Sequence, residues 1–242
     1  MAASATHGMI RTAHAVRSLR EAGPDPDPLL HDELARGLGL WAARFDPVPV
    51  PTQVPPHLDA VEASAALPRL APDVPARGLG INGRLQALVE LVNLPDHLDA
   101  WEAPRSTDDA LTELVGAARV LAARADAPIP FCHAVTAPAA TRLVLPLLSE
   151  EVARRTVQVS WRVIGSLVSA FGDPRDPDES VAASALDTEV AHLLERLPEA
   201  AVAHGDEHVI KLTEAALREY DLSRDVTLLV AADRFRGRMP VG

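Results

Sequence analysis

The sequence predicts an all-α fold, a multi-helix, bundle-like single domain over residues 1–242. Apolar residues recur with helical spacing almost throughout, whereas alternating runs of strand length are scarce. The hydrophobic share is 48% and the aromatic share only 3%, so the core must consist of Ala, Leu and Val. Ala and Leu favour helix. A chain of 242 residues can also bury a sizeable core.

The elements of the first half follow from caps and breakers. Thr6 can cap a first helix that runs to about residue 21, and the Gly-Pro-Asp-Pro-Asp-Pro run at 23–28 ends it. A second helix is expected at about 29–45. Residues 46–56 carry five prolines and predict an extended connector. Shorter helices are expected at 57–70, 82–92 and 95–101.

The second half begins with a clear start signal. Thr107-Asp-Asp opens a helix to about residue 125, with its acids at the positive end of the helix dipole. A loop containing Pro128 and Pro130 follows. Further helices are expected at 133–148, 149–171, 184–196, 199–220 and 224–236. Asp206 is an alternative cap that would begin a new helix at Glu207.

Charge and cysteine usage exclude several classes of protein. The formal net charge is −11 and the basic residues are scattered, which argues against a nucleic-acid partner. The single cysteine, Cys132, permits no internal disulfide and fits a reducing compartment. We expect it to be a small core residue. No apolar run approaches the ~20 residues needed to span a bilayer, and the N-terminus lacks the charged-then-apolar layout expected of a secretory signal. We therefore expect a cytoplasmic protein without a membrane partner.

Two segments at opposite ends of the chain carry nitrogen-bearing side chains at positions i, i+4 and i+7. Such positions lie on one face of a helix. A packed core gains nothing from these groups, because each buried nitrogen needs a partner, so the pattern is typical of a functional site. The side chains are His7, Arg11 and His14 in the first segment and His204, His208 and Lys211 in the second.

Not every nitrogen in these segments can bind a metal. The guanidinium of Arg11 never deprotonates, so we expect it to pair with an acid or a substrate oxygen. His204 joins the face only if a helix runs unbroken through Asp206, so we place it outside the metal shell. His133 follows a loop that contains prolines. Because His7 and His208 are also candidate ligands, we expect His133 to belong to the site rather than to be only structural. Solvent-facing positions are expected for His31, His57, His97 and His192.

Three runs, at residues 6–17, 133–136 and 206–215, resemble the questin oxidase family. The family is known from fungal secondary metabolism, in aromatic polyketide pathways, and from short bacterial homologues. The similarity is spread over most of the chain. It implies oxidative ring opening of an anthraquinone-like aromatic substrate by dioxygen. It also implies a non-haem iron held by histidines and by a lysine modified with carbon dioxide.

Carried over residue by residue, the resemblance makes His7, His133 and His208 the imidazole ligands and Lys211 the carbamate. A buried lysine with a depressed pKa can add carbon dioxide and become an anionic oxygen donor. Such ligands suit Fe(II) with a vacant position for dioxygen, although ligand type alone leaves zinc and manganese open. His14 and Arg11 are the expected catalytic residues, which would orient substrate or move protons.

The sequence also departs from the family. Longer members carry an N-terminal segment with its own histidine motif, which nothing here matches, and Arg11 stands where some relatives have a histidine. The site is then either reduced or part of a fragment that needs the missing segment.

Rival functions also remain open. A non-catalytic helical protein with a degenerate metal site would bind a flat apolar ligand, and a metal hydrolase would use a bound water. No dinucleotide fingerprint is present, so a built-in nicotinamide domain is not expected. NADPH consumption and assembly into a homo-oligomer stay open.

Overall fold

The structure is a computed structural model that describes residues 5–45, 54–122, 128–172 and 189–241. It confirms the all-α prediction, since eleven α-helices and two short 3-10 helices account for most of these ranges. Within them the only extended pairing is an isolated bridge between Leu58 and Trp101. Every helix in the described ranges is too short or too polar to cross a membrane.

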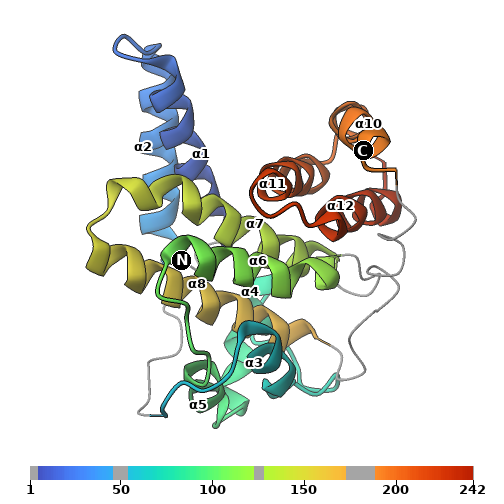
Figure 1. Ribbon diagram of the computed structural model, residues 1–242. Coiled ribbons are helices and arrows are strands. Elements are labelled where there is room, and N and C mark those ends of the chain that lie inside the picture. The colour runs from blue at the N-terminus through green and yellow to red at the C-terminus, as the bar shows by residue number, and fades with distance from the viewer. Residues whose placement is uncertain (1–4, 46–53, 123–127, 173–188, 242) are drawn as a thin grey trace.

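Three helices form the centre of the molecule (Figure 1): α6 (Thr107–Ala122), α7 (Pro128–Val144) and α8 (Glu150–Phe171). They pack on one another through a core rich in Ala, Leu and Val, as the composition predicts, but the core also contains aromatic side chains such as Phe131 and Trp161. The start of α8 is as predicted, because the Ser149 hydroxyl accepts a hydrogen bond from the backbone N–H of Val152. Most of the predicted connector and the interval 173–188 lie outside the described residues.

Helices α1 (His7–Ala22) and α2 (Pro28–Ala43) form a hairpin that projects from this centre (Figure 1). The Asp27 carboxylate caps α2 by accepting from the N–H of Leu29. The two helices approach closely at Gly8, where an added Cβ would lie 2.8 Å from Trp41 Cα. Helix α1 packs on α7, which brings His7 beside the central helices.

The region between the hairpin and α6 contains short elements: α3 (Ala60–Ala66), α4 (Gly80–Gln86), the 3-10 turn η1 (Ala87–Glu90) and α5 (Leu94–Asp99). All lie near the three predicted short helices. The first begins later than predicted because Asp59 and Glu62 form a capping box that sets its start.

The predicted start of α7 at His133 is wrong. The helix begins at Pro128, and Pro130 lies within its first turn. Proline is compatible with the first turn because its missing N–H would have no partner in the helix there. His133 consequently lies inside the helix, and the last predicted residues form a 3-10 turn, η2 (Leu145–Leu147).

Three helices close the fold: α10 (Val190–His204), α11 (Glu207–Ser223) and α12 (Val226–Arg238). The predicted break near Pro198 is wrong, because α10 continues through it and buries Leu197 and Ala201. The predicted single helix over 199–220 is also wrong. Gly205 adopts a left-handed φ of 80° and ends α10. The Asp206 carboxylate then caps α11, which confirms the alternative start at Glu207.

Candidate metal centre

Three imidazoles from remote parts of the sequence converge at one place. His7 is the first residue of α1, His133 lies in α7, and His208 is the second residue of α11. One ligand atom from each lies within 4.8 Å of the other two. The closest pair is His7 Nε2 and His133 Nε2, which are 3.1 Å apart. The structure therefore brings together the three histidines that the sequence singled out.

The packing of α1 and α11 against α7 produces this convergence. His133 is completely buried at 0% exposure, whereas His7 is half-buried and the His208 side chain is 13% exposed. The ring centroids are separated by 4.6 Å for His7 and His133, 6.0 Å for His7 and His208, and 5.5 Å for His133 and His208. The centre thus has one fixed inner ligand and two outer ones.

Thr6 stands at the predicted N-cap position of α1, but its side chain does not cap the helix. Its side chain makes no capping hydrogen bond, and its backbone is left-handed with a φ of 74°. The hydroxyl instead lies 3.2 Å from Nδ1 of His133. His133 therefore has Thr6 at one ring nitrogen and His7 at the other.

The electrostatic environment favours the neutral form of the three imidazoles. Burial lowers the pKa of His133 well below its ordinary value, and the nearby charges act in the same direction. Burial also lowers the pKa of His7 and His208, with a further lowering by the charge of Lys211. Glu207 opposes both shifts without reversing them. A neutral imidazole is the form that ligates a metal.

Lys211 lies one turn after His208 on α11 and beside an acidic residue. Its Nζ is 3.5 Å from Glu207 Oε2, and Glu207 Oε1 is 3.7 Å from His208 Nε2. The Glu207 side chain is 64% exposed, so this pair marks the solvent side of the centre. Lys211 is close enough for its charge to lower the pKa of all three histidines.

The two predicted catalytic residues lie further along α1 and have different partners. Nη2 of Arg11 donates to Glu33 Oε2 of α2 at 2.8 Å, so the guanidinium pairs with an acid, one of its two expected partners. Nε2 of His14 lies 3.9 Å from Glu214 Oε2 of α11. Burial lowers the pKa of His14, and the Glu214 carboxylate opposes that shift.

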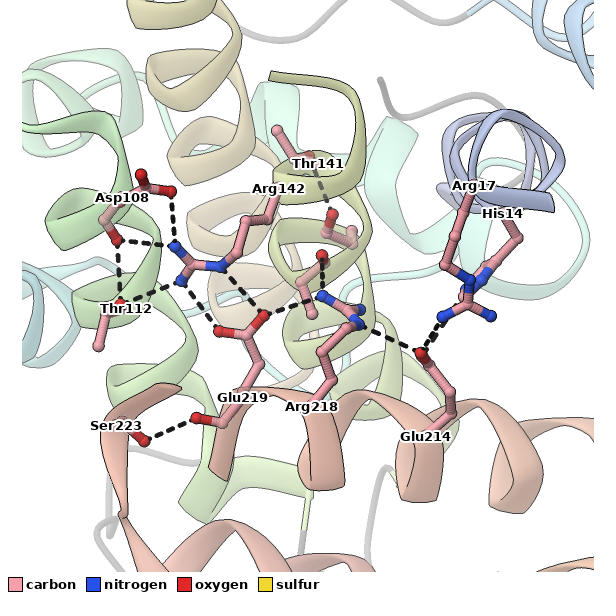
Figure 2. Close-up of polar contacts among 12 residues, drawn as sticks. His14, Arg17, Asp108, Thr112, Thr141, Arg142, Glu214, Arg218, Glu219 and Ser223 are labelled. Carbon is pink, nitrogen blue, oxygen red and sulfur yellow. Dashed lines mark hydrogen bonds and ion pairs between the residues drawn. The ribbon is translucent and has the colours of Figure 1, made fainter. Parts of the chain in front are cut away.

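Sequence reasoning missed a network of arginines and glutamates that connects four helices (Figure 2). Glu214 Oε1 accepts from Arg17 of α1 and, at 3.1 Å, from Arg218. Glu219 is buried, with a side chain only 2% exposed, and accepts from Arg218 at 3.1 Å and from Arg142 of α7 at 2.9 Å. Arg142 also reaches Asp108 and Thr112 of α6. In the sequence, the only sign of this network was the i, i+4 spacing of Glu214 and Arg218.

Two further residues near the centre are not ligands in this geometry. The Cys132 thiol is buried and donates to the carbonyl oxygen of His208 at 3.6 Å, and burial raises its pKa to about 12. A protonated thiol is a poor ligand, which agrees with the expected core role. His204 ends α10, where its Nε2 lies 3.2 Å from the carbonyl oxygen of Met239. It stands outside the histidine group, as expected.

The three imidazoles fit a divalent transition metal. Bonds of about 2.0–2.1 Å in octahedral or tetrahedral geometry separate neighbouring ligand nitrogens by roughly 2.9–3.4 Å. The 3.1 Å between His7 and His133 falls in that range, and the separations to His208, all within 4.8 Å, would have to shorten for the three rings to bind one ion. Nδ1 of His208 is buried and makes no hydrogen bond within the described residues, although Asp206 Oδ1 lies 3.5 Å away. Such an atom needs an explanation, and coordination is one.

No family model, curated protein or solved structure matches the chain. The class that the fold and the site define is an all-α protein with a three-histidine candidate metal centre. The assignment of a function therefore depends on the geometry of this centre and on the chemistry of its residues.

Proposed function

We propose that the chain is a metal-dependent oxygenase of the questin oxidase type, in which His7, His133 and His208 hold a non-haem ferrous ion. The supporting observation is that these three imidazoles converge within 4.8 Å from three distant helices. Three neutral nitrogen donors leave coordination positions for an anionic oxygen and for dioxygen. A ferrous ion bound there would supply the capacity to activate dioxygen toward a small, electron-rich aromatic substrate.

In this proposal, residues of the chain position the ion and move protons. The buried His133 holds its ligand position rigidly, while His7 and His208 border the side from which a substrate can approach. In this proposal His14 moves protons, because its neutral ring can accept one and the carboxylate of Glu214, 3.9 Å away, stabilises the resulting imidazolium. Arg11 acts indirectly, since its pairing with Glu33 holds α2 on α1 next to His7.

Lys211 supplies the anionic oxygen in this proposal. Its neutral Nζ attacks the carbon of carbon dioxide, a proton leaves the nitrogen, and a carbamate monoanion results. The modification replaces the attraction between Lys211 and Glu207, 3.5 Å apart, with repulsion between two anions. We therefore expect the carbamate to form only when a divalent cation compensates the second negative charge. A carbamate signal in carbon-13 NMR after addition of labelled bicarbonate tests this step.

Metal analysis tests the proposal. Protein purified without added metal is loaded with ferrous iron under nitrogen and then exposed to dioxygen with a hydroxylated anthraquinone. We expect one iron per chain and substrate-dependent oxygen uptake. His208→Ala should lose the iron, whereas His192→Ala, a change at an exposed histidine, should retain it. A stoichiometry far below one in the unaltered chain would refute the proposal.

One observation favours a second candidate function, a non-catalytic helical protein that binds a flat apolar ligand. At 3.1 Å, His7 and His133 can share a hydrogen bond and satisfy each other without a metal. In that case a ligand would raise the melting temperature equally with and without a chelator, because specific binding stabilises the folded state regardless of metal. Iron binding with turnover that ignores dioxygen would instead indicate a hydrolase that uses a metal-bound water.

A further inference from the structure

We propose that Thr6 is a positioning residue of the metal centre, whose hydroxyl holds the His133 ring so that Nε2 faces His7 and the metal. The two contacts that carry this inference are Thr6 Oγ1 to His133 Nδ1, at 3.2 Å, and His133 Nε2 to His7 Nε2, at 3.1 Å. The inference rests on the metal site proposed above.

The backbone at Thr6 is strained. Ala5 and Thr6 have φ values of 52° and 74°, in the left-handed region that β-branched residues rarely adopt. Glycine would relieve the strain, and the backbone carbonyl of Thr6 could still accept the N–H of Ile10, as it does at 3.0 Å. The start of α1 therefore does not require a threonine. Strained residues cluster at functional sites, where the surrounding structure holds them in place.

Because Thr6 and His133 are buried, the Thr6 hydroxyl is the partner of His133 Nδ1 in place of bulk water. Thr6 and His133 are each 0% exposed, so bulk water does not reach either side chain. Without the hydroxyl, Nδ1 of His133 would lose its partner, and leaving a buried polar atom unpaired is costly. A ring flip in search of another partner would move Nε2 away from His7. The Thr6 contact thus opposes the ring orientations that would disassemble the centre.

A hydroxyl suits both states of the centre. Without a metal it can donate to Nδ1 while the Nε2–H of His133 donates to His7, so every ring nitrogen of His133 is satisfied. With a metal on Nε2, the proton must sit on Nδ1, and the hydroxyl then accepts it. Partners of this kind fix the orientation of ligating histidines and raise their basicity.

The experiment compares zinc affinities, with zinc as a redox-inert probe, by competition with a chromophoric chelator. Thr6→Val keeps the shape but removes the hydroxyl, and we expect roughly 10–100-fold weaker binding. Thr6→Ser keeps the hydroxyl, so its zinc affinity should match that of the unaltered chain. The matched control is Thr12→Val, the same change at a buried threonine of α1 whose hydroxyl donates to the Gly8 carbonyl oxygen at 2.7 Å. It should leave the affinity unchanged.

Thr6→Gly is a second variant, in case Thr6→Val does not fold. It relieves the backbone strain and lacks the hydroxyl, so it should bind zinc as weakly as Thr6→Val. Nitrogen-15 NMR of the zinc-loaded chain adds a measurement that a change in folding stability alone would not affect. The Nδ1–H of His133 should exchange slowly in the unaltered chain and in Thr6→Ser, and rapidly in Thr6→Gly. Equal zinc affinity of Thr6→Gly and the unaltered chain would overturn this inference alone. Failure of the unaltered chain to bind zinc or ferrous iron would overturn both this inference and the proposed function.

Discussion

Mild acid should destabilise the metal-free protein at a pH well above the range in which its carboxylates titrate. Burial lowers the pKa of His7, His14, His133 and His208 below the ordinary value of 6.5. As the pH falls through 6.5, the unfolded chain takes up protons at these positions and the folded chain does not. Because the unfolded state binds more protons in this window, the free energy of unfolding decreases as the pH decreases.

The size of the effect follows from burial. A histidine that stays neutral in the folded state costs about 1.4 kcal/mol of stability between pH 7.5 and pH 5.5. His133, at 0% exposure, should contribute that full amount. His7, His14 and His208 are partly exposed and lie near carboxylates, so each contributes a fraction. The total lies between about 1.4 and about 5 kcal/mol, a large part of the 5–15 kcal/mol that is typical of folded proteins.

The assay is urea unfolding at pH 7.5 and 5.5 in the presence of a chelator. The pKa values of Asp206 and Asp233 are lowered from an already acidic value, so these carboxylates do not titrate in this window. His133→Gln should reduce the loss of stability by about 1.4 kcal/mol, whereas His31→Gln, at an exposed position, should not change it. Equal stability of the unaltered chain at the two pH values would refute the reasoning.

Two packing predictions can be measured by urea unfolding. Glu219→Gln should cost about 3 kcal/mol, because it removes the buried carboxylate that pairs with the partly buried Arg142 and Arg218; in contrast, Glu150→Gln, in an exposed ion pair, should cost little. Gly165→Ala should cost about 1–3 kcal/mol, since its Cβ would lie 2.3 Å from buried Leu98. Gly39→Ala, which meets nothing within 4 Å, should stabilise α2. Equal effects within either pair would contradict these assignments.

Local chemistry made much of the secondary structure predictable. A cap acts on N–H groups two or three residues away, so its effect can be read within one short window of sequence. Asp206 is an example, and α11 begins directly after it. Apolar spacing similarly predicted an all-α fold.

Prolines were the main source of error in the helix boundaries. The sequence interpretation assigned Pro128 and Pro130 to a loop and ended a helix before Pro198, yet both helices include these residues. For α10, burial of Leu197 and Ala201 on either side of Pro198 compensates for the lost hydrogen bond. Such compensation depends on neighbouring helices, which no local window contains.

The sequence by itself determined which side chains could bind a metal, because ligand chemistry belongs to the residue type. Only the tertiary structure decided which of them meet. It joined His7 to His133 across 126 positions, and it turned Thr6 from a cap into a partner of His133. It also gave Arg11 the Glu33 carboxylate as its partner, where the sequence left an acid and a substrate oxygen open. The physical reason is that a helix sets only the direction of a side chain, whereas the packing of α1 and α11 on α7 sets its neighbours.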